Sequence, residues 1–182
     1  LTLTVNSPVK AEDLKALDAK TSVAINAKAA GIVVNGNAAD IKAVIKSAGV
    51  DLAANAVINV TGKISAADAS TIASATTGVV TAEVTAGSAA ALNKALVDPT
   101  NSANNKLTLT VTGATAAASD LNGLNGKTIE VVDATAVKTI TGLLSDLNAV
   151  YAAKGANQIK LNDVTNATVN GILTVADAVA LR

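Results

Sequence analysis

The chain has 182 residues, half of them apolar, and its 14 basic residues balance its 14 acidic residues, so the formal net charge is zero. Charged residues make up only 15% of the chain, which leaves no basic field to attract nucleic acid. The apolar residues are almost all aliphatic, because Tyr151 is the single aromatic residue. A core of small aliphatic side chains is typical of thin layers that repeat one geometry, and not of a core filled by aromatic rings.

The missing residue types exclude several kinds of chemistry. Without His or Cys, Ser-His-Asp and Cys-His catalytic centres and ordinary zinc sites are impossible. No apolar stretch reaches the roughly 18 residues of a membrane span, and no leader sequence is visible. We therefore expect a protein that is not an enzyme, with no catalytic, cofactor-binding or metal-binding residues, no nucleic-acid partner and no membrane insertion.

Helix-like and strand-like patterns alternate along the chain. Apolar residues three and four apart predict six helices, at 11–17, 39–45, 67–72, 92–96, 119–124 and 145–151. Runs rich in β-branched residues predict strands at 1–5, 32–35, 79–84, 106–111, 129–132 and 138–141. Strands that are joined through helices run parallel. We therefore expect the α/β class, with one or more parallel sheets flanked by helices.

The predicted helices carry recognisable ends. Asn37 and Ser65 stand three residues before Asp40 and Asp68, which is the spacing of a capping box with Asp in place of Glu. An acid in the first turn also interacts favourably with the helix dipole. Two helices are followed by glycines that we expect to end them, Gly49 and Gly155.

The pattern repeats about every 52 residues. Three marker series carry this period: Val60, Val111 and Val164; Gly36, Gly87 and Gly142; Thr21, Thr77 and Thr128. They predict a repeat solenoid of stacked helix-strand-helix-strand coils, as a single array over 1–182. Its units would be about 9–62, 63–113 and 114–166, with a partial fourth at 167–182. Each half-unit of about 25 residues has the length of a leucine-rich repeat, and one sheet or two per coil remain alternatives.

Paired carboxylates could still carry out acid–base chemistry. Five carboxylates recur at the same point of the predicted units: Asp13, Asp68 and Asp120, and separately Asp40 and Asp146. Catalytic residues do not recur in every coil, so we interpret these acids as part of helix capping, and Glu12 as a further exposed first-turn acid.

Other polar motifs are weaker. The isolated acids Asp51, Asp98, Asp133 and Asp163 could bind calcium between coils, but no EF-hand or glycine-rich calcium repeat is present, and we favour a surface role. The segment 123–128 ends in Gly-Lys-Thr but lacks the earlier glycine of a phosphate loop, so it predicts a turn. The segment 101–105 looks like an insertion at a coil edge without a binding anchor.

Threonines alternate with Leu and Val in two strand-like segments, at positions 2, 4, 108, 110 and 112. They predict a solvated strand face. The alternative is an ordered threonine array that binds ice or polysaccharide, but Glu83, Glu130 and Asp133 interrupt it. Tyr151 lies on the apolar stripe of its helix, and we expect it to pack in the core or at the helix edge.

Two sequence segments resemble a known family. Residues 120–128 read Asp-Leu-Asn-Gly-Leu-Asn-Gly-Lys-Thr, and 137–151 read Val-Lys-Thr-Ile-Thr-Gly-Leu-Leu-Ser-Asp-Leu-Asn-Ala-Val-Tyr. They resemble degenerate repeats of giant cyanobacterial and proteobacterial cell-surface or secreted proteins. The likeness is good over 114–166 and weaker over the first two units. It implies an extracellular or surface-exposed structural array, linked to adhesion, motility or defence, without an active site.

These observations predict a structural or spacer repeat segment of a large bacterial cell-surface or secreted protein. Its partners would be neighbouring repeats of the parent chain, and its abrupt ends favour end-to-end self-association. The alternative is an adhesive binding module that contacts polysaccharide, ice or protein through a sheet face or edge loops. A carboxylate-dependent glycan lyase or hydrolase ranks third, and it would need a cluster of acids and Lys that breaks the repeat.

Overall fold

The computed structural model describes residues 3–97, 104–163 and 165–171. The chain forms two compact units, each with its own helices and sheets. The first unit comprises Leu1–Thr85, Ala95–Thr108 and Lys127–Glu130, and the second comprises Ala86–Lys94, Leu109–Gly126 and Val131–Arg182.

All six predicted helices are confirmed. They are α1 (Ala11–Asp18), α2 (Ala38–Lys46), α3 (Ala66–Ala73), α4 (Ala89–Ala95), α5 (Ala118–Asn125) and α6 (Leu144–Gly155). The fourth residue of every helix is an aliphatic side chain that is at most 4% exposed: Leu14, Ile41, Ala69, Leu92, Leu121 and Leu147. This position fixes the face that each helix turns towards the core. Among the described residues, no helix combines the length and the apolar character that crossing a membrane requires.

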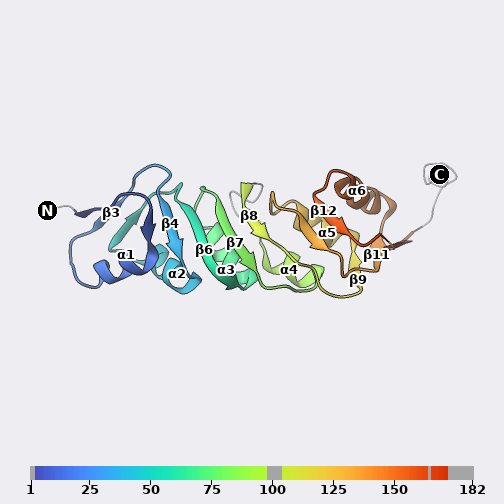
Figure 1. The fold of residues 1–182 in the computed structure, drawn as a ribbon, viewed down its shortest axis with the longest axis horizontal. Helices are drawn as coiled ribbons and strands as arrows, with labels where there is room; N and C mark the ends of the chain where they lie inside the picture. The colour runs from blue at the N-terminus through green and yellow to red at the C-terminus, as the bar shows by residue number, and fades with distance from the viewer. Residues whose placement is uncertain (1–2, 98–103, 164, 172–182) are drawn as a thin grey trace. The chain divides into compact units, whose positions relative to one another are not determined.

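The first unit contains two parallel sheets (Figure 1). One has the order β1-β3-β5 and consists of Leu3–Thr4, Ile25–Ala27 and Val50–Leu52. The other has the order β2-β4-β6-β7-β8 and consists of Val9–Lys10, Val33–Gly36, Val57–Ile64, Val80–Val84 and Lys106–Thr108. Helices α1, α2 and α3 follow one another along the flank of the second sheet.

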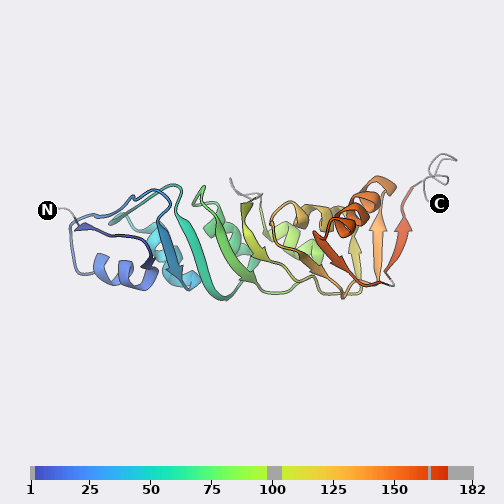
Figure 2. The same ribbon diagram turned by 45° about the horizontal axis from the view of Figure 1, so that its top comes forward.

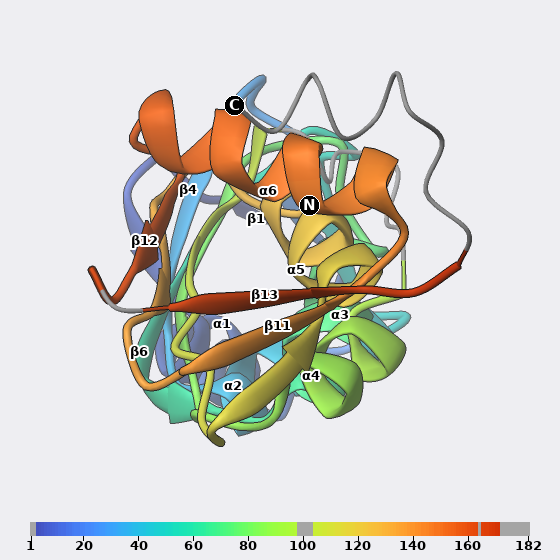
Figure 3. The same cartoon turned by 90° about the vertical axis from the view of Figure 1, so that its right-hand side faces the viewer.

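The second unit also contains two parallel sheets (Figures 2 and 3). One pairs β10 (Val132–Ala134) with β12 (Ile159–Leu161). The other has β11 (Thr139–Gly142) between β9 (Thr115–Ala117) and β13 (Asn166–Val169). Figure 2 shows β9 in yellow, β11 in orange and β13 in red. The α/β class with parallel strands is therefore confirmed, and each unit has two sheets.

The strand register shows a step of about 25 residues. Ile25 pairs with Val50 in one sheet of the first unit, and Val33 pairs with Val57 in the other. The steps that end in α1, α2, α3 and α6 contain one strand of each sheet of their unit followed by a helix, and we call this a β-β-α segment; among the described residues only β7 lies between α3 and α4. The step is half of the 52-residue period predicted from the markers. The hydrogen bonds between strands show the shorter step, because β3 pairs with β5 and β4 pairs with β6 across a single helix.

Close backbone approaches explain the recurring glycines before the helices. A Cβ atom on Gly36 would lie 2.9 Å from the Cβ of Ala11, and one on Gly142 would lie 3.0 Å from the Cβ of Ala118. Ala11 and Ala118 are the first residues of the preceding helices. Each strand end therefore passes against the start of the previous helix, and both partners must be small.

Hydroxyl groups organise the turns that lead from helices back to strands. The Oγ1 atoms of Thr21, Thr76 and Thr128 each accept a hydrogen bond from the backbone N–H two residues later, at 2.9 to 3.0 Å. Ser47 accepts from Gly49 in the same way. These are hydroxyl-capped turns. The predicted marker Thr77 is thus wrong by one residue, because the hydroxyl of Thr76 makes this contact.

The predicted glycine helix ends are wrong in detail. Gly155 is the last residue of α6, and the left-handed conformation falls on Asn157, with φ 58°. Gly49 is needed for another reason, since a Cβ there would lie 1.9 Å from Oδ1 of Asp18. The turns after these helices therefore do not use a left-handed glycine.

Candidate functional site

The five recurring acids occupy one structural position. Each is the third residue of its helix: Asp13 in α1, Asp40 in α2, Asp68 in α3, Asp120 in α5 and Asp146 in α6. The sequence-based expectation that they recur at the same point is therefore confirmed. Each acid sits on a helix of its own, and α4 has Ala91 at this position.

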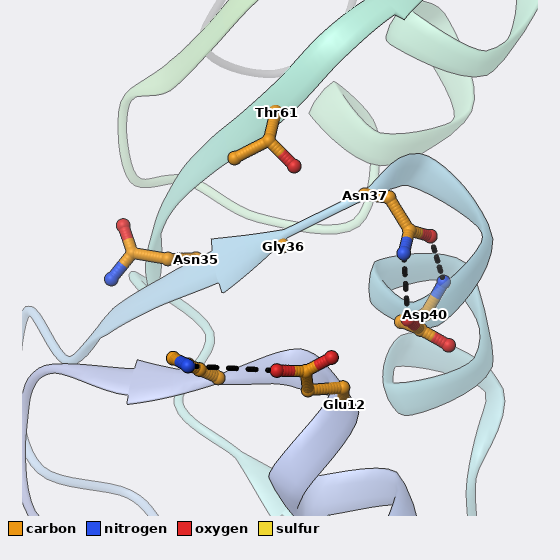
Figure 4. A pocket seen from close by; sticks show the side chains of 7 residues that line it. Glu12, Asn35, Gly36, Asn37, Asp40 and Thr61 are labelled. Carbon is orange, nitrogen blue, oxygen red and sulfur yellow. Dashed lines mark hydrogen bonds and ion pairs between the residues drawn. The ribbon is translucent and has the colours of Figure 1, made fainter.

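Helix capping accounts for two of these acids. The Asn37 side chain accepts a hydrogen bond from the Asp40 N–H at 2.9 Å and donates one to its Oδ2 at 2.7 Å (Figure 4). Ser65 Oγ accepts from the Asp68 N–H at 3.0 Å. In α1, α5 and α6 the N-cap residue makes no side-chain hydrogen bond. Capping is therefore not the role that the five acids share.

A hydrogen bond from the preceding helix is more general. In the first unit, Lys15 Nζ donates to Asp40 Oδ1 at 2.7 Å, and Lys42 Nζ donates to Asp68 Oδ1. Lys15 and Lys42 are the fifth residues of α1 and α2. The donor thus stands at the fifth position of one helix and the acceptor at the third position of the next.

The second unit repeats this geometry with amide donors. Asn93, the fifth residue of α4, donates to Asp120 Oδ1 at 3.0 Å. Asn122, the fifth residue of α5, donates to the backbone carbonyl of Asp146 at 3.0 Å. We call these four contacts the helix ladder.

A glycine makes room for one ladder contact. A Cβ atom on Gly123 would lie 2.5 Å from Oδ1 of Asn93. Gly123 stands three residues after Asp120, on the same side of α5. The small residue therefore lets the Asn93 side chain lie against α5 and reach its acceptor.

Charge strengthens the ladder only in the first unit. The Lys15 ammonium, with help from Asn37, holds the pKa of Asp40 below its ordinary value. The Lys42 ammonium does the same for the pKa of Asp68, against a smaller opposing effect of burial. The side chains of Lys42 and Asp68 are 30% and 34% exposed, so solvent screens their pair, which is worth at most about 1 kcal/mol. The ladder therefore aligns neighbouring helices more than it holds the fold together.

Sequence reasoning missed the donors. The signal was present, since Lys15, Lys42 and Asn122 each stand two residues after a recurring Asp. The sequence does not carry this pair of residue types at α3 and α4. There, α3 has Ser70 at its fifth position and α4 has Ala91 at its third.

A concave surface lies where β2 and β4 lead into α1 and α2 (Figure 4). Its volume is about 230 Å³, and seven residues line it: Lys10, Glu12, Asn35, Gly36, Asn37, Asp40 and Thr61. We call it the α1–α2 groove. The carboxyl ends of parallel strands are a common place for ligands, and this groove therefore merits a chemical assessment.

The groups in the groove suit binding better than acid–base catalysis. Asp40 is engaged by Lys15 and Asn37, which lower its pKa. Glu12 lies 3.6 Å from the Lys10 ammonium, and both side chains are more than 60% exposed. A catalytic pair of carboxyl groups needs one raised pKa, and the interactions of Asp40 act in the opposite direction.

Three of the groove residues, Lys10, Glu12 and Asn37, have no counterpart of the same type in the second unit, whereas Gly36 and Asp40 correspond to Gly142 and Asp146. At the corresponding helix positions of the second unit, Ala117 replaces Lys10, Ser119 replaces Glu12 and Leu143 replaces Asn37. The helix ladder is thus common to both units, whereas these three polar residues of the groove break the repeat.

The isolated acids are separately engaged. Asp51 lies 2.6 Å from the Lys28 ammonium. Asp133 accepts hydrogen bonds from the hydroxyl and N–H of Thr135, which lower its pKa. Asp163 lies 3.9 Å from Lys154, and Asp98 falls outside the described residues. Across the described ranges, no group of three or more acids could hold a metal ion.

The Gly-Lys-Thr segment forms a turn, as predicted. The hydroxyl of Thr128 accepts from the N–H groups of Leu107 and Glu130 and lies 2.9 Å from the Leu107 carbonyl. Tyr151 packs at the edge of α6, 37% exposed, with its hydroxyl 3.4 Å from the Thr165 carbonyl. Of the predicted loop 101–105, only the last two residues are described, and Asn105 is buried.

The threonine segment alternates as predicted, but its rows are mixed. Thr108 and Thr112 are exposed, whereas Leu107, Leu109 and Val111 are buried. Thr4 pairs with Asn26, Thr108 with Glu83 and Thr110 with Asp133. These rows therefore place amides and acids beside threonines, and not threonine upon threonine.

Comparisons with protein-family models, with curated proteins and with solved structures give no match to this chain.

Proposed function

We propose that the chain is a non-enzymatic structural segment, a solenoid of β-β-α segments that acts as a spacer in a large bacterial cell-surface or secreted protein. The helix ladder carries this proposal. Within each unit its contacts join one helix to the next through the same two positions, as in Lys15–Asp40 of the first unit and Asn122–Asp146 of the second.

A repeated contact of this kind suits a spacer. In repeat proteins each unit contacts only its neighbours, so the array lengthens by adding units without changing those already present. The strand register supports the same view, since in both units a strand pairs in parallel with the strand one β-β-α segment further on, for example Leu3 with Ile25 and Val132 with Ile159. The aliphatic composition and the resemblance of 114–166 to surface-protein repeats support the location.

Small-angle X-ray scattering of the 182-residue chain tests the architecture. A solenoid gives an extended particle with a radius of gyration well above about 16 Å, the value of a compact domain of this length. A radius of gyration at that compact value would contradict the proposal.

A second function, adhesive binding, is favoured by the α1–α2 groove because three of its polar residues break the repeat. The amides of Asn35 and Asn37 and the hydroxyl of Thr61 offer both donors and acceptors, as the hydroxyl groups of a saccharide require. Nuclear magnetic resonance titration with bacterial polysaccharide fragments tests it. Shifts confined to Glu12, Asn35 and Thr61, and lost in Asn35→Leu, would support this function. Equal shifts at Ser119 and Leu143 would contradict it.

A further inference from the structure

The third and seventh residues of each helix lie one turn apart on the same face. The third residue receives the ladder contact from the preceding helix, so the seventh also faces that helix. In four helices the seventh residue is aliphatic and at most 2% exposed: Val44, Ile72, Leu124 and Val150. Together, the two positions form a receiving face with one polar and one apolar contact.

The first helix has the same receiving face, and no helix among the described residues precedes it to pack there. Its third residue, Asp13, is exposed and has no hydrogen bond or ion pair with any described residue. Its seventh residue, Leu17, is partly exposed, in contrast to the buried residues at this position in α2, α3, α5 and α6. The face is therefore complete in residue type and lacks only its partner.

Both sheets of the first unit end on the same side as this face. β1 is the outer strand of β1-β3-β5, and β2 is the outer strand of β2-β4-β6-β7-β8. Among the described residues, the outer backbone groups of these two strands have no strand partner. Edge strands offer ready hydrogen-bonding sites to a further strand. In the next segment, α2, β3 and β4 have a surface of the same kind, and α1, β1 and β2 cover it. The receiving face of α1 and the outer edges of β1 and β2 form the corresponding surface of the first segment.

We propose that the surface formed by Asp13, Leu17 and the outer edges of β1 and β2 docks a further β-β-α segment of this kind. The helix of that segment carries Lys at its fifth position, because both ladder donors of the first unit are lysines, Lys15 and Lys42. The ammonium group contacts Asp13, and an apolar flank of the helix covers Leu17. This inference rests on the proposed structural function and names the partner of one end.

An extended chain tests the proposal. A copy of residues 21–47, which contains β3, β4 and α2, is joined directly before Leu1. The spacing is kept because Leu3, Ile25 and Val50 share one register row, so that Leu1 takes the place of Ala48 after the copied helix. Hydrogen exchange of the backbone amides of α1 and β2 is then compared with exchange in the original chain.

We expect the added segment to slow exchange in α1 and β2 by about tenfold or more, because end segments of repeat arrays fray and interior ones do not. Asp13→Lys should remove at least about twofold of that protection in the extended chain, the scale of a surface ion pair. In the original chain the same substitution should have a smaller effect, that of the helix dipole alone. Combining Asp13→Lys with Lys42→Asp in the copy should restore protection, and Glu130→Lys, at an exposed acid elsewhere in the unit, should change nothing.

Unchanged exchange in α1 on extension would overturn the proposal. So would an equal effect of Asp13→Lys in both chains, since Asp13 would then act within α1 alone. The readout concerns one end of the first unit, so it is separate from the scattering test of the solenoid. If scattering showed a compact particle but the added segment still slowed exchange in α1, the solenoid architecture would be contradicted. The proposed docking surface would still be supported.

Discussion

The two units join neighbouring helices through the same two positions but with different chemistry. In the first unit the ladder donors are the charged Lys15 and Lys42, whereas in the second they are the neutral amides of Asn93 and Asn122. The geometry is therefore kept while the donor changes. The position of a contact in the segment matters more to this fold than its charge, which is expected if the contact sets alignment and burial supplies most of the stability.

Truncating the buried seventh residues gives the largest expected effect and tests whether the apolar contact is equal in the two units. Ile72→Ala in α3 and Leu124→Ala in α5 remove side chains that are fully buried. Each should lower the free energy of unfolding by about 2 to 5 kcal/mol, as measured by urea denaturation. A large difference between the two would mean that the units differ in more than their polar donors.

Filling the space at Gly123 should break an amide contact of the second unit. The added methyl of Gly123→Ala would meet the Asn93 side chain at 2.5 Å, and overpacking of this kind costs about 1 to 3 kcal/mol. The control is Gly126→Ala, where the nearest atom would lie at an ordinary 3.6 Å. Equal urea midpoints for the two variants would show that Asn93 moves aside without loss.

Salt should distinguish charged from amide contacts. Lys42→Met removes the donor to Asp68 and should lower stability by about 0.5 to 1 kcal/mol at low salt, with most of the loss absent near 1 M salt because ions screen the pair. Lys46→Met is the control on the same helix, since Lys46 makes no ion pair among the described residues. Asn93→Leu should cost a similar amount at both salt concentrations, and a salt-dependent loss there would count against the comparison.

Acid should weaken the first unit's ladder by a smaller amount. The pKa values of Asp40 and Asp68 are lowered in the folded chain by their lysine partners. A lowered folded pKa gives stability that is present above the unfolded value, near 4, and is lost as the pH falls through the folded value. The effect of Asp68→Asn on the urea midpoint should therefore be clear at pH 6 and shrink below about pH 4. A constant effect across this range would contradict the assigned cause.

The sequence predicts the helices well because each has a full set of local signals. In α2, for example, Ile41 and Val44 define the core face, and Asn37 with Asp40 marks the start. The strands are predicted less well, since 129–131 is rich in β-branched residues yet only Val132–Ala134 pairs. Pairing depends on a partner one whole β-β-α segment away along the chain, and that information is not local.

In the candidate site, too, local contacts could be predicted from the sequence and contacts between distant residues could not. Capping by Asn37 and Ser65 could be predicted, because both partners lie within one turn. The contact from Lys15 to Asp40 joins residues 25 positions apart. The predicted half-unit of about 25 residues already makes the two helices neighbours, but the fifth position of one helix can be matched with the third position of the next only when the first residue of each helix is known.

The half-length step has a consequence for how such a chain changes over generations. Within one unit, loss or duplication of one whole β-β-α segment would bring the fifth position of one helix opposite the third position of another and would keep each strand beside a strand of its own sheet. Loss of a few residues inside a strand shifts its side chains to the wrong face. Unequal recombination between neighbouring segments can therefore shorten or lengthen this protein in whole steps, and its length can evolve without a new fold.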